Sequence, residues 1–174
     1  LLTIESPAFL KVLNTKELEN LAQNVRDFLI ESLTKTGGPL SSNLRAVELS
    51  IGLHRVFNSP TDKIIFDGND QTLTHKILTG RAKHFSRFGQ QGGLSSFQSK
   101  NESAHDPYDG SSFYQGLSIG YGLSMKNDAD HIVVVLNNQS IQSGYVFEAL
   151  NHISMSKKKM IVVINDYQSS DQLK

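Results

Sequence analysis

The sequence predicts an α/β domain in which a central parallel β-sheet is flanked by helices on both faces. The clearest support is the last third, where apolar runs at residues 131–136 and 160–164 enclose a helical stretch at about 143–155. Such a strand–helix–strand order is a βαβ unit with parallel strands. Several helices precede it, and 174 residues suffice for one domain with a substantial core. We therefore treat residues 1–174 as a single domain.

The first long element is expected to be a helix that begins after Asn14. Asn14 followed by Glu17 is a capping signal, and apolar residues then recur at helical spacing as far as Leu33. The Gly-Gly-Pro triplet at residues 37–39 cannot continue a helix. The helix is therefore predicted to end before Gly37.

A second helix is expected to follow, with Ser42 or Asn43 as its cap. Apolar residues at helical spacing predict its inner stripe: Leu44, Val47, Ile51 and Val56. A short buried strand at residues 64–66 then ends at Asp67.

The middle of the chain is expected to be less regular. Residues 72–79 predict a short helix stopped by Gly80. Residues 85–109 are rich in Gly, Ser, Gln and Asn and predict a long irregular loop, which is usually functional or partly disordered. Residues 116–125 predict a helix whose several glycines indicate either close packing against another backbone or local instability.

Composition narrows the functional classes. Lys+Arg and Asp+Glu balance at 17 each, so no overall positive field favours nucleic acid or an anionic membrane. The absence of cysteine fits a cytoplasmic protein, which is the location we expect. The sequence has no apolar run of membrane-spanning length and no signal-peptide pattern, so no membrane association is expected.

The turn after the strand at residues 131–136 is the most informative motif. A phosphate- or metal-binding fold normally places glycines and an acidic residue at this point. The turn here reads Asn137-Asn138-Gln139-Ser140 and has neither. The surroundings thus indicate a cofactor site whose usual binding groups are missing.

A series of segments closely resembles the N-terminal, diphosphate-binding domain of the 1-deoxy-D-xylulose-5-phosphate synthase family. That family comprises thiamine-diphosphate enzymes related to transketolase. In order along the chain, the segments are Lys35-Thr36-Gly37-Gly38, Ser42-Asn43-Leu44, Val47-Glu48-Leu49, Ser59 to Ile65, His75-Lys76-Ile77-Leu78-Thr79-Gly80-Arg81, Gly92-Gly93-Leu94-Ser95 and Phe147-Glu148-Ala149-Leu150-Asn151. The resemblance runs from Leu1 to about Ser170 almost without gaps.

The resemblance implies a three-layer αβα fold that holds the diphosphate of the cofactor and a Mg²⁺ ion. It also implies the family's reaction, the condensation of pyruvate with glyceraldehyde 3-phosphate with loss of carbon dioxide, which serves isoprenoid biosynthesis. A second domain of such an enzyme holds the aminopyrimidine ring, and a third completes the chain. Companion domains, a separate subunit or a homodimer partner are therefore expected to cover apolar surface of this domain.

Both metal-ligand positions that the resemblance implies are altered. The family's Gly-Asp-Gly turn corresponds to Asn137, Asn138 and Gln139, and a second ligand, an asparagine, corresponds to Tyr167. Asn138 lacks the charge that attracts Mg²⁺, and a protonated Tyr167 is a poor ligand. We therefore expect neither the metal nor thiamine diphosphate to bind.

Asn165 and Asp166 follow the next strand and offer an alternative pair of ligands. We interpret them instead as the strand end and turn that Asn and Asp commonly form.

Three histidines of the family's active site are also replaced. Their positions are occupied by Pro39, Asp70 and Ser112. Imidazole is the natural proton shuttle near neutral pH, so no catalytic residue is expected at these positions. Asp70 would in addition repel a diphosphate.

Four polar residues near the implied site match the family: Asp67, Gln71, His75 and Lys76. His75 and Lys76 have two interpretations, an anion contact at the start of a short helix or a structural role that fixes the loop against the sheet. We favour the structural role. His54 is interpreted as a packed helix residue rather than a ligand.

Three hypotheses follow. The first is a non-catalytic homologue that keeps the fold, has lost the Mg²⁺ and thiamine-diphosphate site, and serves as a scaffold or regulatory partner. The second is a part or subunit of an active synthase or transketolase-type enzyme that binds its metal through Asn138 and takes proton shuttles from a partner chain. The third is a binding module for another anionic ligand. We favour the first, because framework motifs persist while the residues that would touch cofactor or substrate are replaced together.

Overall fold

The computed structural model describes residues 1–111, 113–126 and 131–166. Its β-sheet has three parallel strands in the order β1, β2, β3. These are Lys63–Phe66, Ile132–Asn137 and Ile161–Asn165. The α-helices are α1 (Thr15–Thr36), α2 (Leu40–Arg45), α3 (Val47–Val56), α4 (Leu73–Lys76), α5 (Gly116–Lys126) and α6 (Gly144–Ser154). Short helical turns complete the order: η1 (Pro7–Val12), η2 (Ile77–Arg81), η3 (Ala82–Arg87) and η4 (Ser140–Gln142).

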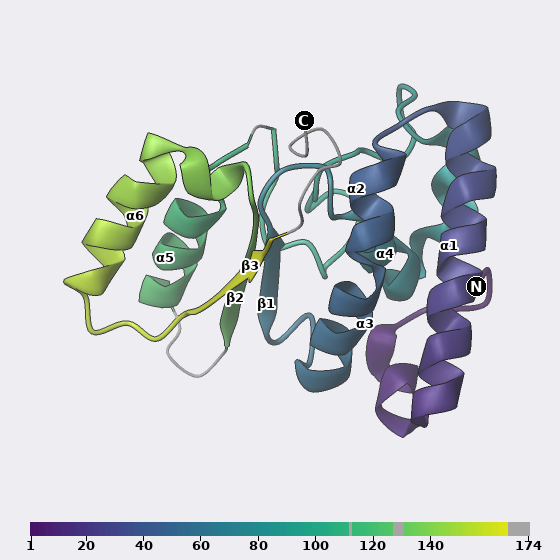
Figure 1. Ribbon diagram of the computed structural model, residues 1–174, viewed down its shortest axis with the longest axis horizontal. Coiled ribbons are helices and arrows are strands. Elements are labelled where there is room, and N and C mark those ends of the chain that lie inside the picture. The colour runs from purple at the N-terminus through teal and green to yellow at the C-terminus, as the bar shows by residue number, and fades with distance from the viewer. Residues whose placement is uncertain (112, 127–130, 167–174) are drawn as a thin grey trace, which may run out of the picture.

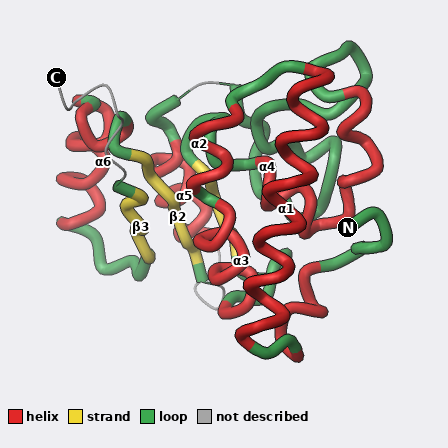
Figure 2. Tube along the Cα trace, turned by 45° about the vertical axis from the view of Figure 1, so that its right-hand side comes forward, coloured by secondary structure: helices red, strands yellow, loops and turns green. Residues whose placement is uncertain are grey.

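The sheet separates two helical layers. In Figure 1, α5 and α6 lie on one side of the strands and α1 to α4 on the other, and Figure 2 shows α6 and α1 on opposite sides of the strands. Every residue of β2 is buried, as expected for a parallel strand covered on both faces. The predicted three-layer α/β fold and its βαβ unit are confirmed.

Successive side chains of each strand point to opposite faces of the sheet and pack against the two helical layers in turn. Ile65, Val134 and Leu136 pack in one apolar cluster with Val146 of α6. Ile64 and Val133 belong to a second cluster on the opposite face, which includes residues of α3. The strands are thus held by apolar burial on both sides.

The N-terminal helix α1 follows its sequence signals closely. The side chain of Asn14 accepts a hydrogen bond from the N–H of Glu17 at 3.0 Å, and the Glu17 carboxylate accepts one from the N–H of Asn14 at 2.7 Å. This capping box satisfies two of the free donors at the helix start. The helix ends at Thr36, and Gly37 follows with φ of 80°, so both predicted ends are confirmed.

The prediction of a single second helix capped by Ser42 or Asn43 is wrong. Ala46, with φ −97° and ψ 4°, separates α2 from α3. Asn43 lies inside α2, where its side chain donates to the carbonyl of Pro39 and accepts from the N–H of Leu73. Val56, predicted to face the core, is 68% exposed, because at 3.6 residues per turn it lies on the opposite face of α3 from the buried Val47.

The prediction that a short helix stops at Gly80 is confirmed, because Thr79 and Gly80 separate two helical stretches. The chain continues through η2 into η3, with non-helical dihedrals at Thr79 and Gly80. Gly80 has φ of 91°, and a Cβ there would lie 2.8 Å from the carbonyl oxygen of Glu5. The glycine therefore allows the turn that ends this helix close to the N-terminal segment and leads into the next helical stretch.

Two of the three glycines of α5, Gly116 and Gly120, are explained by close packing. A Cβ on Gly120 would lie 2.6 Å from a methyl group of Val134 on β2, and one on Gly116 would lie 3.0 Å from Asp67. These contacts bring α5 close to the sheet. Among the described residues, no helix is long and apolar enough to cross a membrane.

Candidate functional site

The carboxyl ends of the three strands bring polar side chains to one edge of the sheet. Asp67 follows β1, Asn137 ends β2 and Asn165 ends β3. The N–H of Asp67 donates to the carbonyl of Val135, and Asn137 is aligned with Asn165 in the parallel register. This edge is where ligands of open α/β sheets bind.

Asp67 uses both carboxylate oxygens to join neighbouring elements. Its Oδ1 accepts from the N–H of Gly116 at 2.9 Å, and its Oδ2 accepts from the hydroxyl of Ser140 at 2.6 Å. Asp67 and Ser140 are both buried. The retained carboxylate therefore ties the end of β1 to the start of α5 and to the turn after β2.

The side chain of Asn137 stabilises the turn after β2 by hydrogen bonds to its backbone. Its Oδ1 accepts from the N–H groups of Gln139 and Ser140, at 2.9 and 2.7 Å. Its Nδ2 donates to the Asp70 carboxylate at 2.6 Å. The turn thus has two backbone donors satisfied by its own first residue, and Asn137 is fully buried.

The remaining strand-end residues form a second link. Asn165 donates from Nδ2 to the Oε1 of Gln71 at 2.8 Å. Gln71 is buried, and its Nε2 has no hydrogen-bond partner among the described residues.

The remaining positions of the implied cofactor site differ in burial. Asn138 is half-buried and Gln139 is exposed. Pro39 stands at the start of α2, and Ser112 and Tyr167 lie outside the described residues.

His75 and Lys76 belong to a different cluster, buried beside the sheet. His75 Nδ1 lies 2.8 Å from His54 Nε2, and its Nε2 lies 2.7 Å from Asp106 Oδ1. Arg81 contacts both oxygens of Asp106, at 2.5 and 2.9 Å. The histidines stack with ring centroids 5.0 Å apart. Asp106 comes from the long loop, so this cluster fixes the loop against α3 and α4.

The hydrogen bonds of this cluster determine which ring nitrogen of His75 and of His54 carries the hydrogen. An ionised Asp106 only accepts, so His75 carries its hydrogen on Nε2 and accepts at Nδ1. His54 must then donate from Nε2. Its Nδ1 becomes an acceptor, and it has no partner among the described residues.

Burial governs the charge states. It lowers the pKa of His75 from 6.5 to about 4, although the hydrogen bond to Asp106 opposes this shift. Burial, followed by proximity to His75, lowers the pKa of His54 well below its ordinary value. Burial alone would raise the pKa of Asp106, but hydrogen bonds from His75 and Arg81 outweigh it and lower the pKa. Both histidines are therefore neutral beside an ionised carboxylate near pH 7.

Lys76 is also completely buried, with its ammonium group paired to Glu102. Burial lowers its pKa, and the hydrogen bond to Glu102 opposes that change. Glu102 also accepts from the N–H of Ser95 at 2.6 Å. His75 and Lys76 thus both anchor the long loop, and they are not among the strand-end contacts described above.

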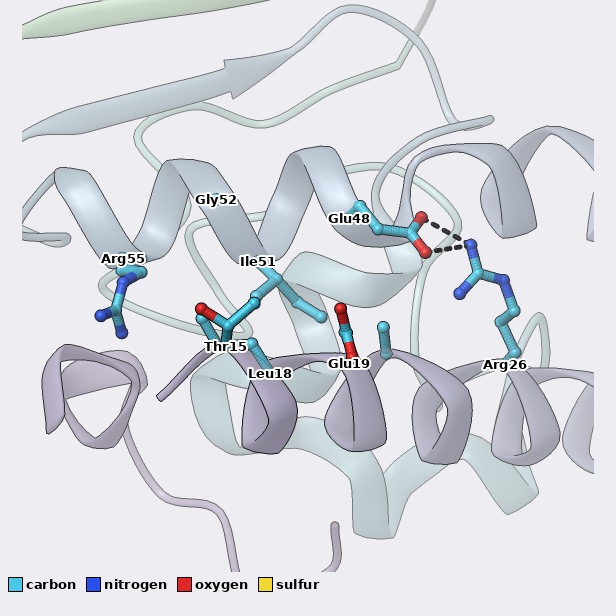
Figure 3. A pocket seen from close by; sticks show the side chains of 9 residues that line it. Thr15, Leu18, Glu19, Arg26, Glu48, Ile51, Gly52 and Arg55 are labelled. Atoms are coloured by element: carbon cyan, nitrogen blue, oxygen red, sulfur yellow. Dashed lines mark hydrogen bonds and ion pairs between the residues drawn. The ribbon is translucent and has the colours of Figure 1, made fainter. Parts of the chain in front are cut away.

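A pocket of about 280 Å³ lies between α1 and α3, and no residue of either cluster lines it. Figure 3 shows Leu18 and Ile51 within it and the Arg26–Glu48 ion pair, at 2.5 Å, closing one end. The pocket has an apolar floor and charges of both signs at its rim, and none of the predicted site residues lines it.

The strand-end residues do not fit a Mg²⁺ site. Asp67 is committed through both oxygens to Gly116 and Ser140, and the position of the metal-binding carboxylate is the neutral Asn138. Across residues 1–111, 113–126 and 131–166, no group of three or more His, Asp or Glu side chains is placed to hold a metal ion. Mg²⁺ takes oxygen ligands, and protein sites usually supply one or two of them as carboxylates.

The residues missed from the sequence are Asp106, Arg81 and Glu102. Asp106 is 31 positions from His75, and Glu102 is 26 positions from Lys76. No local periodicity or spacing signals such pairs, and only the fold brings them together.

Comparison with known proteins relates this chain to one family. Residues 1–172 match the family described as 1-deoxy-D-xylulose-5-phosphate synthase. Proteins of that name from Geobacillus sp. (strain WCH70) and Alkaliphilus oremlandii are each 44% identical over 96% and 98% of this chain. 1-Deoxy-D-xylulose-5-phosphate synthase 1 of Geobacter sulfurreducens is 43% identical over 97% of it. The chain spans only 27–28% of the length of these relatives.

Proposed function

Because this chain belongs to the 1-deoxy-D-xylulose-5-phosphate synthase family, matching its N-terminal domain, we propose that it is a non-catalytic member. In this proposal the domain has lost the Mg²⁺ and thiamine-diphosphate site and serves as a scaffold or regulatory partner. Family membership alone is equally compatible with a part of an active synthase, so the proposal depends on the strand-end residues.

The observation that carries the proposal is the side chain of Asn137. Anion sites at the ends of parallel strands use backbone N–H groups of the following turn as donors. Here the N–H groups of Gln139 and Ser140 already donate to Asn137 Oδ1. A diphosphate would have to displace this buried side chain before it could use those donors.

The negative charge of Asp70 also opposes binding of a diphosphate. The Asp70 carboxylate lies beside Asn137, at a position that a histidine holds in the family by resemblance. A negative group at that point repels phosphate, and neutral Asn138 attracts no cation to offset it. The replacements therefore act together against the cofactor.

A different ligand in the remodelled pocket is the second candidate. Gln71 favours it, because its Nε2 is a buried donor with no partner in the described parts of the chain. A buried donor left unpaired costs about 1–3 kcal/mol, which a ligand acceptor would offset.

Isothermal titration calorimetry of the full chain tests the proposal. We expect no Mg²⁺-dependent binding of thiamine diphosphate at micromolar concentration. The same titration on a chimera, in which this chain replaces the matched part of the Alkaliphilus oremlandii relative, supplies the regions absent here and should also give no binding. Clear micromolar binding that requires Mg²⁺ would overturn the proposal.

Two controls separate the alternatives. A variant with Asn137→Gly, Asn138→Asp, Gln139→Gly, Asp70→His and Tyr167→Asn should gain Mg²⁺-dependent binding in the chimera. Inorganic pyrophosphate without Mg²⁺ is the probe for the second candidate, since binding of it by the unmodified chain would indicate an anion site of another kind.

A further inference from the structure

The pocket between α1 and α3 has an apolar floor that belongs to the core of the domain. Leu18 and Ala22 of α1 and Ile51 of α3 line it. Ala22 and Ile51 are each 4% exposed and lie in the apolar cluster between these helices, against which Leu18 also packs. Because close-packed interiors deform little, the hollow of about 280 Å³ has a well-defined base.

Gly52 of α3 keeps this hollow open. It lies inside the helix, where glycine is less favourable than alanine, and a Cβ at this position would meet nothing within 4 Å. Its φ is not positive, so neither a close contact nor a left-handed backbone requires the glycine. The missing side chain leaves open space in the pocket, which Gly52 lines.

The rim of the pocket carries an unpaired carboxylate. Arg26 and Glu48 form an ion pair at one end and balance each other's charge. Glu19 of α1 also lines the pocket, and no described residue forms a hydrogen bond or ion pair with it. Figure 3 shows the Glu19 side chain directed from α1 towards α3. This carboxylate is therefore available to a cationic group of a ligand.

Arg55 places the opposite charge at the other end of the pocket. Its Nη1 donates to the carbonyls of Leu10 and Leu13, at 2.5 and 2.7 Å, and these bonds hold the guanidinium in place. Both acceptors are uncharged, and no carboxylate within the described ranges pairs with Arg55. A guanidinium has five N–H donors, so others remain for the carboxylate of a ligand.

The separation of the two charges indicates the class of ligand. In Figure 3, Thr15 and Leu18 lie between Arg55 and Glu19 along the pocket. An α-amino acid carries its ammonium and carboxylate on one carbon atom and is poorly suited to charges that lie apart. A linear ω-amino acid carries them at the two ends of an apolar chain, which matches the apolar floor. The pocket is smaller than the roughly 300–1,000 Å³ of sites for drug-sized molecules, so the ligand is small.

We propose that the pocket between α1 and α3 binds a small linear zwitterion whose ammonium and carboxylate stand at opposite ends of an apolar chain. The ammonium pairs with Glu19, the carboxylate accepts hydrogen bonds from Arg55, and the chain lies on the apolar floor beside Gly52. The site shares no residue with the strand ends, so it does not depend on the proposed loss of the cofactor site.

Nuclear magnetic resonance titrations of the full chain with 6-aminohexanoate test the proposal, and hexylamine and hexanoate are the matched probes with one charge each. We expect 6-aminohexanoate to shift the backbone amide signals of residues 15–22 and 48–55 saturably. It should bind at least about three times more tightly than either single-charge probe, because each exposed ion pair adds a modest contribution. The absence of saturable shifts in the millimolar range would overturn the proposal. Equal affinity for hexylamine or hexanoate would also overturn it, since only one end of the ligand would then contact a charge.

A substitution of the carboxylate locates the ammonium. Glu19→Gln keeps the size of the side chain and removes its charge. It should weaken binding of 6-aminohexanoate at least about threefold and leave that of hexanoate unchanged, because hexanoate has no ammonium group. Glu31→Gln, on the same helix but outside the pocket, should change neither affinity. An equal effect of Glu19→Gln on both probes would contradict the assigned contact.

A substitution of the glycine tests the position of the chain. Gly52→Leu fills the open space and should abolish binding of 6-aminohexanoate. Gly122→Leu in α5 is the matched control, since a Cβ there also meets nothing within 4 Å, and it should leave binding unchanged. Gly52→Ala is the milder variant, which should weaken binding while raising the melting temperature, because alanine favours the helix. Unchanged binding in either folded Gly52 variant would overturn the proposal.

Discussion

The side-chain amide of Asn137 lies 2.6 Å from the carboxylate of Asp70, which is 67 positions earlier in the chain. In the sequence these are two separate departures from the family's residues. In the structure they are partners, and the same Asn137 also caps the turn after β2. The altered strand ends therefore form a connected, buried polar network instead of a set of isolated losses.

This network should contribute to stability. Asn137→Ala removes the donor to the buried Asp70 and the acceptor for two N–H groups, so we expect unfolding to become easier by about 2–3 kcal/mol. Urea denaturation at pH 7.5 measures the change. Asn151→Ala, at an exposed position of α6, is the matched control and should change stability by less than about 0.5 kcal/mol. Equal effects of the two variants would contradict a role for the Asn137–Asp70 pair.

The buried histidines predict a loss of stability in mild acid. The pKa of His75 is about 4 in the folded state against an ordinary 6.5, and that of His54 is also lowered. Between these pH values the unfolded chain takes up protons that the folded chain excludes. Stability is therefore complete above about pH 6.5 and falls as the pH drops towards 4, by about 1.4 kcal/mol per pH unit for each histidine.

Urea denaturation at several pH values between 7.5 and 5 checks this slope. His54→Gln keeps an amide donor for His75 Nδ1 but does not titrate, so it should remove about half of the slope. His84→Gln, at an exposed position of η3, should leave the slope unchanged. An unchanged slope in the His54 variant would contradict the assignment.

Local signals predicted the elements that depend on neighbours in sequence. Asn14 and Glu17 located the start of α1, and the apolar runs located all three strands. The break at Ala46 had no such signal, because alanine is a good helix former. Val56 was mispredicted for a separate reason, since its spacing from the buried Val47 does not match the helical period.

The candidate site was predictable only as a list of positions. The family resemblance placed Asp67 near the site of the turn at Asn137, and the structure brings them together because the carboxyl ends of parallel strands share one edge. The pairing of Asn165 with Gln71, and of His75 with Asp106, joins residues 94 and 31 positions apart. Such contacts depend on the complete packing of the domain, and no periodicity in the sequence specifies them.

The Asp106 cluster should hold the long loop in place. Asp106→Asn removes the charge that pairs with buried Arg81 and accepts from His75, so we expect a loss of about 3 kcal/mol and faster exchange of amides in residues 88–111. Asp109→Asn, at an exposed loop carboxylate that accepts from Lys100 and Ser99, should cost less than about 1 kcal/mol. Similar exchange rates in the two variants would show that the loop is held by other contacts.

The glycines of α5 provide a paired test of the packing against the sheet. Gly120→Ala places a Cβ 2.6 Å from a methyl group of Val134, whose β-branched side chain has little freedom to move, so we expect a loss of about 1–3 kcal/mol. Gly122→Ala, two residues later, meets nothing within 4 Å and should stabilise the protein by about 0.5–1 kcal/mol, because alanine favours the helix. Thermal and urea denaturation measure both changes. Since the substitution and the helix are the same, opposite signs isolate the contact with β2, and a gain in stability from Gly120→Ala would mean that α5 lies farther from the sheet than described.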